Sequence, residues 1–291
     1  MTPEEFAYLA GFVRERSGIV LPAEKAYLVE SRLKPLASEH NIRSFGELVT
    51  ALKLKRNEQL ARSVVDLMTT NETLFFRDTK PFDLLRDVVL PLLVESRPKG
   101  RPLRIWSAAC SAGQEPYSIA MTIKENAARF AGWPVEIVAT DISSSVLTKA
   151  RAGVYSQFEV QRGLPIRLLV KYFVQNESQW TVRPDIRDMV QFREQNILED
   201  MVRLGSFDIV FCRNVLIYFD SNTKRTVFER ISRCLAANGV LFLGGTETVI
   251  GITDRFEPIS GHRGIYRMTA CGSTRSRSQG GLASGSDRAS S

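Results

Sequence analysis

One stretch, residues 103–120, constrains the fold more than any other part of the sequence. Its first residues, Leu103 to Trp106, alternate apolar and polar side chains and include β-formers, so they predict a strand. Small residues follow from Ser107 to Gly113, where the backbone must turn tightly, and Pro116 then suits the first turn of a helix. A strand, a small-residue loop and a helix N-terminus together predict a βα turn that cradles a ligand.

The loop matches neither of two common phosphate-binding motifs. Only Gly113 is present where the dinucleotide fingerprint needs three glycines, which disfavours a nicotinamide dehydrogenase. Gln114-Glu115-Pro116 stands where a P-loop needs Gly-Lys-Ser/Thr. A carboxylate at Glu115 disfavours a bound phosphate and favours a ligand with hydroxyl or ammonium donors. A second role stays open for Glu115, as a first-turn carboxylate that complements the helix dipole.

From residue 103 onward the pattern alternates strands with helices, which is typical of an α/β fold. Strands are expected at 103–107, 135–139, 189–194, 207–212 and 239–244, with a final pair near 255–260 and 264–268. Residues 153–188 do not fit the alternation. They contain two β-prone runs, 170–174 and 179–182, around a polar tip, and we expect a hairpin in an inserted small β subdomain.

Polar side chains follow successive strands of the predicted sheet. Asp141 comes just after the second strand, Asn196 after the third, and Arg213 and Asn214 after the fourth. The carboxyl ends of parallel strands share the edge where α/β sheets bind ligands, and an acidic residue there can accept both hydroxyls of a ribose. Simpler roles also stay open: Asp141 can cap a helix with Ser143, and the two asparagines can stabilise turns.

The sequence divides into four parts. Residues 1–70 have apolar residues at helical spacing and predict an all-α domain. Residues 71–102 form a linker and a helix that contribute to the site, and Asp78 or Thr79 is expected to cap that helix. Residues 103–270 form the α/β domain, with 153–188 as its insert. Residues 271–291 are rich in Ser, Gly and Arg and are expected to be disordered.

Composition narrows the class of protein. The four cysteines lack C-x-x-C spacing and there are two histidines, so we expect no metal site, no disulfides and a cytoplasmic location. The chain shows no secretory signal and no apolar run of the ~20 residues that a membrane span needs, so we expect no membrane insertion. The net charge of +7 is diffuse, with no dense basic run, which argues against a nucleic-acid partner.

Four motifs in order resemble those of the chemotaxis receptor methyltransferases, the CheR family. They are Thr-Asn-Glu-Thr-Leu-Phe-Phe-Arg at 70–77, Trp-Ser-Ala-Ala-Cys-Ser-Ala-Gly-Gln-Glu-Pro-Tyr-Ser at 106–118, Ala-Thr-Asp-Ile at 139–142 and Phe-Cys-Arg-Asn-Val-Leu-Ile-Tyr-Phe at 211–219. The resemblance runs from about residue 3 to 268. Gln114 is a departure, because the family pattern usually has Gly-Glu-Glu-Pro-Tyr.

The resemblance implies a protein-glutamate O-methyltransferase that uses S-adenosylmethionine, releases S-adenosylhomocysteine and needs no metal. It implies a doubly wound, Rossmann-like catalytic domain with the small β insert, behind an all-α domain that contacts receptor helices. The cofactor-binding residues that it implies, with Arg213 added from its place after the fourth strand, are Asn71, Thr73, Arg77, Glu115, Asp141, Asn196, Ile197, Arg213 and Asn214. Arg77 and Tyr218 are the catalytic candidates; Tyr218 as a plain core aromatic stays the alternative.

The expected chemistry needs no general base, because a glutamate carboxylate with a pKa near ~4.3 is already ionised at neutral pH. We expect Arg77 to orient that carboxylate and Tyr218 to hydrogen-bond it or the methionyl part of the cofactor. Members of the family that dock on a receptor's C-terminal peptide have a longer, glycine-bearing loop at the tip of the insert. The short tip at 176–178 argues against such tethering, and we expect a monomer.

Two other functions remain open at this point. A methyltransferase that acts on RNA or a small molecule would share the cofactor crevice, although it would give no reason for the Leu-Phe-Phe-Arg linker. A non-catalytic regulator that binds S-adenosylmethionine also stays open, because a sequence does not show turnover.

Overall fold

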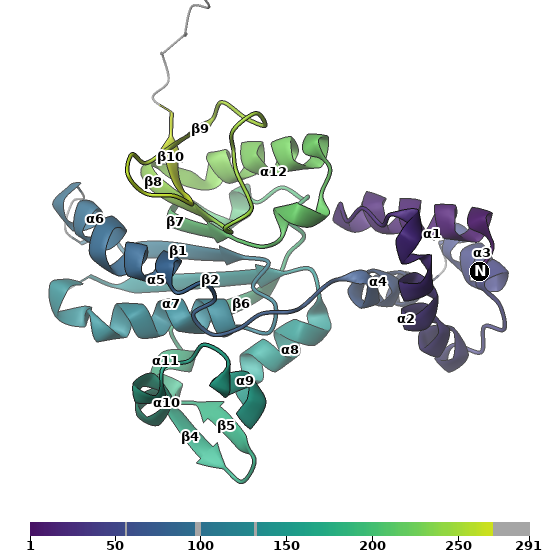
Figure 1. Ribbon diagram of the computed structural model, residues 1–291, viewed down its shortest axis with the longest axis horizontal. Coiled ribbons are helices and arrows are strands. Elements are labelled where there is room, and N and C mark those ends of the chain that lie inside the picture. Colours follow the sequence, from purple (N-terminus) through teal and green to yellow (C-terminus); the bar gives the residue numbers. More distant parts are fainter. Residues whose placement is uncertain (56, 97–99, 131–132, 270–291) are drawn as a thin grey trace, which may run out of the picture.

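A seven-stranded sheet organises the larger part of the chain, and its strand order is β6-β2-β1-β7-β8-β10-β9. The computed structural model describes residues 1–55, 57–96, 100–130 and 133–269 (Figure 1). In this sheet β10 pairs antiparallel with both β8 and β9, and the other described strand pairs are parallel. The strands are β1 (Leu103–Ala108), β2 (Val135–Asp141), β6 (Val190–Glu194), β7 (Phe207–Cys212), β8 (Leu235–Leu243), β9 (Phe256–Pro258) and β10 (Ile265–Met268).

Both faces of the sheet are buried, as expected for parallel strands. Ile105 and Phe211 point into one hydrophobic core, while Trp106 and Val210, their neighbours along the same strands, point into another. Period-two alternation therefore divides the strand residues between two helix layers. The first core includes residues of α5 (Lys80–Leu84), the π-helical turn η2 (Leu85–Val89), α6 (Leu90–Ser96), α7 (Gln114–Glu125) and α8 (Ser144–Ala152).

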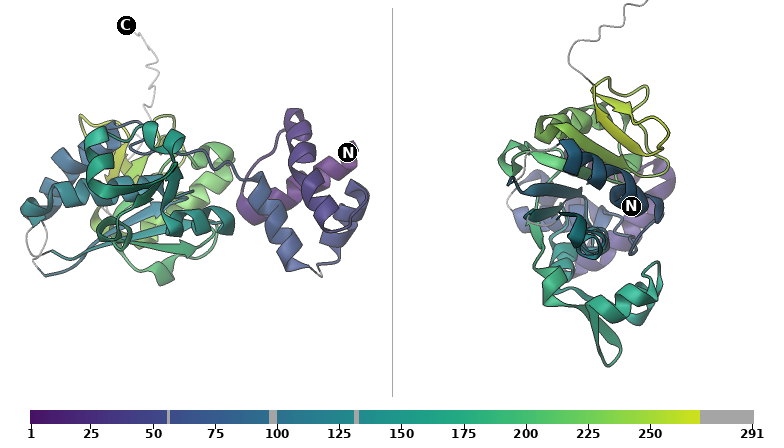
Figure 2. Two further views of the ribbon diagram at one scale, coloured as in Figure 1. Left: turned by 90° about the horizontal axis from the view of Figure 1, so that it is seen from below. Right: turned by 90° about the vertical axis from the view of Figure 1, so that its left-hand side faces the viewer.

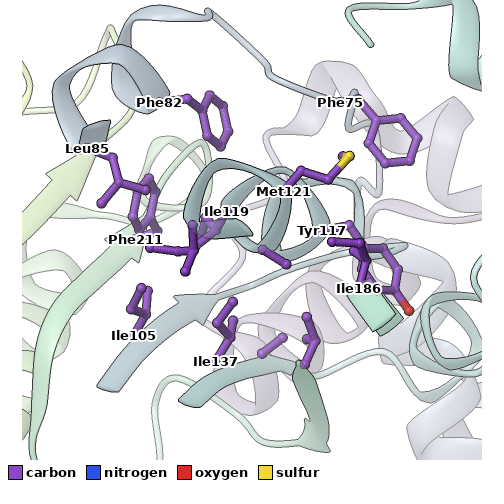
Figure 3. Close-up of a cluster of buried hydrophobic side chains, with 14 of the residues drawn as sticks. Phe75, Phe82, Leu85, Ile105, Tyr117, Ile119, Met121, Ile137, Ile186 and Phe211 are labelled. Atoms are coloured by element: carbon purple, nitrogen blue, oxygen red, sulfur yellow. The ribbon is translucent and has the colours of Figure 1, made fainter. Parts of the chain in front are cut away.

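Figure 3 shows part of this first core, in which Phe82 and Leu85 lie on one side of α7 and Phe75 on the other. The opposite face of the sheet packs on α12 (Ser221–Cys234) and the short turn η4 (Val202–Leu204). The remaining 3-10 segments of this domain are η3 (Ala127–Phe130) and η5 (Leu216–Tyr218). The result is a doubly wound α/β domain, as the sequence predicts.

Four helices form a separate bundle at the N-terminal end, beside the α/β domain (Figures 1 and 2). They are α1 (Pro3–Ser17), α2 (Ala26–Glu39), preceded by η1 (Ala23–Lys25), α3 (Phe45–Lys53) and α4 (Glu58–Met68). Their apolar faces form a core of their own. The chain after α4 then crosses to the α/β domain before α5 begins (Figure 1). Within the described residues, no helix has both the length and the apolar character needed to span a membrane.

The insert between α8 and β6 contains a three-stranded sheet of order β3-β5-β4. Its elements are β3 (Val154–Ser156), α9 (Gln157–Gln161), α10 (Ile166–Tyr172), β4 (Phe173–Asn176), β5 (Gln179–Val182) and α11 (Pro184–Arg187). The predicted hairpin is present as β4 and β5, joined by the two residues Glu177 and Ser178. Its first strand was predicted too early, because 170–172 are the end of α10.

The predicted strands of the main sheet are all found. β8 is the largest deviation, since it starts at Leu235 instead of 239. Thr79, one of the two predicted caps of the helix after the linker, occupies the N-cap position of α5, but its side chain makes no capping bond, and Asp78 pairs with Arg213. The prediction of a disordered tail at 271–291 lies outside the described residues.

Candidate functional site

A cleft at the carboxyl end of the parallel strands brings all the predicted site residues together. About 840 Å³ of space free of protein atoms lies within it, a figure that includes open solvent at its mouth. The ten predicted residues that line it are Asn71, Thr73, Arg77, Glu115, Asp141, Asn196, Ile197, Arg213, Asn214 and Tyr218. Their shared location follows from the topology, because the carboxyl ends of β1, β2, β6 and β7 lie along one edge.

The loop between β1 and α7 forms the floor of the cleft. Ala109 and Ser111 adopt left-handed backbone conformations, with φ of 55° and 50°, which cost non-glycine residues of order 1 kcal/mol or more and cluster at functional sites. Gly113 is also left-handed, and a Cβ atom there would lie 3.0 Å from Ala150 Cβ. This loop therefore needs small residues, and its backbone closely approaches the space above it.

Asp141 is 6% exposed and is held by the same loop. Its Oδ2 accepts a hydrogen bond from Ser111 N–H at 2.8 Å, and its Oδ1 accepts one from Ser143 N–H at 2.9 Å. Burial raises the pKa of Asp141, and these two backbone donors oppose the rise. The helix cap of α8 is the Ser143 side chain, so Asp141 supports this turn and lines the cleft. Each carboxylate oxygen can still accept a further hydrogen bond.

An ion-pair network around the buried Arg213 forms a second wall. Arg213 Nη1 lies 2.9 Å from Glu115 Oε2, and Arg213 Nη2 lies 2.7 Å from Asp78 Oδ2. Glu115 also accepts a hydrogen bond from the Ser107 hydroxyl at 2.8 Å. Burial raises the pKa of Glu115, while the charge of Arg213 lowers it. Both predicted cofactor residues Glu115 and Arg213 thus have protein partners, and Arg213 orients Glu115.

The linker after α4 covers one side of the cleft and is fixed at several points. The Ser111 hydroxyl donates to Asn71 O at 2.8 Å, and Phe76 N–H donates to the Ser118 hydroxyl at 2.9 Å. Arg77 donates to the carbonyl of Glu72 at 3.0 Å and has no ion-pair partner among the described residues. The Arg77 guanidinium therefore keeps donors for a ligand or substrate.

The segment after β7 closes the opposite side. Asn214 has a left-handed backbone with φ of 58°, and Tyr218 ends the short turn η5. Tyr218 lines the cleft, and its hydroxyl makes no hydrogen bond to any described residue. The Tyr218 carbonyl accepts a bond from Val20 N–H at 2.9 Å, which joins this segment to the N-terminal helices.

The N-terminal domain also lines the cleft, which the sequence did not predict. Ser17 and Ile19, at the end of α1, belong to its wall. Asn196 donates from Nδ2 to the carbonyl of Arg16 at 2.6 Å. Asn196 Oδ1 accepts a bond from Leu198 N–H, so its predicted alternative as a turn residue is also realised. No sequence pattern indicates that the end of α1 meets the strands.

The chemistry of the cleft suits a small ligand that carries hydroxyl groups and a positive charge. Asp141 and Glu115 supply buried carboxylates, and the wall between them includes the apolar side chains Cys110, Ile142 and Ile197. Carboxylates in such surroundings accept hydroxyl donors and favour a cation. Within the described residues, no group of three or more His, Cys, Asp or Glu side chains is placed to hold a metal ion.

Comparison with known proteins agrees with this geometry. Residues 4–69 match the family model described as CheR methyltransferase, all-alpha domain, and residues 71–265 match CheR methyltransferase, SAM binding domain. The chain is 46% identical to chemotaxis protein methyltransferase 1 of Pseudomonas aeruginosa, over 90% of this chain and 97% of that protein. It is 42% identical to chemotaxis protein methyltransferase of Vibrio parahaemolyticus, over 92% of this chain and 98% of that protein.

Among solved structures, glycopeptide N-methyltransferase MtfA complexed with S-adenosylmethionine covers 60% of this chain and 51% of its own, at 14% identity and a TM-score of 0.35. A similarity at that level carries no argument about the site.

Proposed function

The chain belongs to the CheR family of S-adenosylmethionine-dependent methyltransferases, and we propose that it transfers the methyl group to glutamate side chains of chemotaxis receptors. The observation that carries this proposal is that the Arg77 guanidinium has hydrogen-bond donors left for a substrate. Arg77 lines the cleft, it lacks an acidic partner among the described residues, and Tyr218 lines the same cleft. An arginine fork and a phenol are suited to hold a carboxylate.

The residues of the cleft fit S-adenosylmethionine. Asp141 would accept the ribose hydroxyls, because it lines the cleft and each of its oxygens, with one backbone bond, can accept another. Glu115 would attract the positively charged end, and Asn71, Thr73, Asn196, Ile197, Arg213 and Asn214 would complete the walls. The small residues Ala109 and Ser111 permit close approach of the ligand to the loop.

When bound, S-adenosylmethionine supplies an electrophilic methyl group on a sulfonium cation. The chain itself needs no general base, because a glutamate carboxylate is ionised at neutral pH. Arg77 would set the direction of that carboxylate through two donors, and Tyr218 would add a third. The buried walls keep water away, so separated charges are less well solvated than the partly neutralised transition state.

The partners follow from the same assignment. We propose that the N-terminal helices contact the cytoplasmic helical region of the receptors, and that the enzyme works as a cytoplasmic monomer without a nucleic-acid partner. The two-residue turn at Glu177–Ser178 supports the absence of tethering to a receptor C-terminal peptide, because it leaves no loop to form a further pocket.

The test is incubation of the full chain with methyl-labelled S-adenosylmethionine and a receptor cytoplasmic fragment. The expected product is label on the receptor that mild base releases as methanol, the behaviour of a glutamyl ester. A receptor fragment with its acceptor glutamates changed to glutamine should take up no label.

Other outcomes would refute the proposal in distinguishable ways. Label in RNA or in a small molecule would show another substrate class for the same cleft. Tight binding of S-adenosylhomocysteine with no transfer to any acceptor would show a regulator instead of an enzyme.

A further inference from the structure

A buried carboxylate outside the predicted set holds the segment that closes the cleft. Glu247 follows β8, is 8% exposed, and accepts four backbone hydrogen bonds. Its Oε2 accepts from Asn214 N–H at 2.8 Å and from Gly244 N–H at 2.7 Å. Its Oε1 accepts from Val215 N–H at 3.0 Å and from Leu216 N–H at 2.8 Å.

Three of these four donors belong to consecutive residues, 214–216, that lead into η5. Such N–H groups have no partner within a short turn of this kind and need an external acceptor. Asn214 also has its left-handed backbone here, a conformation that persists only where surrounding contacts hold it. The Glu247 carboxylate is the acceptor for these N–H groups, and it also holds Asn214 in its left-handed conformation. Its bonds are strong because hydrogen bonds to an anion are stronger than bonds between neutral groups.

We propose that Glu247 is a positioning residue for methyl transfer, which fixes residues 214–218 so that Asn214 and Tyr218 face the cleft. Glu247 itself does not line the cleft. Its effect passes through the backbone of the segment that carries those two side chains. The inference rests on the proposed function, which places S-adenosylmethionine in this cleft.

Glu247→Gln removes this support with little change in shape. An amide has one acceptor oxygen, so it can serve one pair of donors, while its NH₂ group faces the other pair. Either the bonds to Asn214 and Gly244 or those to Val215 and Leu216 are lost. Asp208 provides a matched control, since it is also 8% exposed and accepts a backbone N–H, that of Arg104 at 2.8 Å. It lies on β7 at the end remote from the cleft.

The experiment is calorimetry of S-adenosylhomocysteine with both variants, at a temperature where circular dichroism shows each to be folded. We expect Glu247→Gln to weaken binding about 10-fold or more, because Asn214 would no longer be held in place on the cleft wall, and Asp208→Asn to weaken it less than about two-fold. In steady-state kinetics, kcat should fall while KM for the receptor stays within about two-fold, because under the proposed function the N-terminal helices make most of the contact with the receptor.

A purely structural role would give a different pattern, in which both variants lose thermal stability and neither loses affinity. That result would overturn the proposal. If Glu247→Gln does not fold, Gly244→Ala tests the same contact, because the added Cβ would lie 2.7 Å from Glu247 Oε2 and 2.9 Å from Asn214 Nδ2. Unchanged affinity in Gly244→Ala would then refute the inference, and a loss of several-fold would support it.

The inference and the proposed function can fail separately. Binding of S-adenosylhomocysteine needs no methyl acceptor. If the wild-type chain binds it but does not methylate receptors, the proposed substrate is refuted. The affinities of the Glu247 and Asp208 variants then still test the positioning role of Glu247.

Discussion

Arg213 and Glu115 form an ion pair, 2.9 Å from Nη1 to Oε2, in which both side chains are buried within the wall of the cleft. Removing one partner of such a pair leaves the other charge buried and uncompensated, which costs more than the pair itself contributes. This asymmetry makes the pair a sensitive point for stability and for its dependence on pH.

Arg213→Met should lower the free energy of unfolding by about 3 kcal/mol at about pH 8. Burial already raises the pKa of Glu115 above its ordinary value of 4.5, and loss of Arg213 should raise it further. A raised carboxyl pKa means that the folded state holds the proton more tightly than the unfolded state. The loss of unfolding free energy in Arg213→Met should therefore become smaller as the pH falls through the folded-state pKa of Glu115. Urea unfolding at about pH 8 and pH 5 measures this difference.

The control for this variant is Asp78→Asn, since the Asp78 side chain is half exposed and leaves the Arg213–Glu115 pair intact. It should cost less than about 1 kcal/mol. Equal losses of unfolding free energy in the two variants would contradict the view that Arg213 compensates the buried charge of Glu115. So would a loss in Arg213→Met that does not depend on pH.

Asp141→Ala should weaken binding of S-adenosylhomocysteine by roughly 1–3 kcal/mol, as for loss of a charged hydrogen-bonding partner. Calorimetry measures this directly. Ser143→Ala is the control, because Ser143 caps α8 without lining the cleft. If both variants lose stability but keep affinity, Asp141 only supports the turn and does not bind ribose.

Arg77→Lys should keep a positive charge yet lose the fork that aligns a carboxylate. Methyl transfer should fall about 10- to 1000-fold, a rise in the barrier of roughly 1.4–4 kcal/mol, while affinity for S-adenosylhomocysteine changes much less. Single-turnover rates at saturating cofactor separate the two effects. Full recovery of the rate in excess cofactor would make Arg77 a cofactor ligand only.

Tyr218→Phe should give a milder defect than Arg77→Lys, because a single hydroxyl is removed and the ring remains. We expect a loss of about 3- to 30-fold in methyl transfer with unchanged thermal stability, since that hydroxyl has no hydrogen-bond partner among the described residues. A wild-type rate would show that Tyr218 is a packing residue.

A receptor without a C-terminal peptide should be methylated as fast as one that carries it. Calorimetry of the isolated peptide with the full chain should give no measurable heat, because the β4–β5 turn offers only Glu177 and Ser178. Micromolar binding of the peptide would refute this prediction.

The strands and the location of the site were predictable from sequence because both depend on local patterns. Alternation of apolar residues marks each strand, and the topology of a parallel sheet then places residues such as Asp141 and Asn214 at one edge. The roles of the ten residues remain predictions, since their shared cleft does not show what each one binds.

The features that the sequence did not predict depend on contacts between distant segments, for which the sequence has no local signal. Glu247 occupies a turn with no motif, and three of its four partners lie 31–33 residues earlier in the chain. Asp78, one of the two predicted helix caps, pairs with Arg213, a residue 135 positions later in the chain. In the insert, 170–172 has β-prone residues, yet Leu168, Leu169 and Tyr172 are buried as the apolar side of α10, and this packing overrides local preference.

The junction at Gly18 limits how this enzyme can be recombined with its relatives. Gly18 ends α1 with φ of 77°, and a Cβ there would meet Thr223, Leu198 and Phe219 at 3.0–3.2 Å. The helical bundle is therefore not an exchangeable module that a flexible tether joins to a separate enzyme. A chimera with a bundle from another family member would have to preserve this glycine and its three neighbours, so the bundle and the residues that it meets have to be exchanged together.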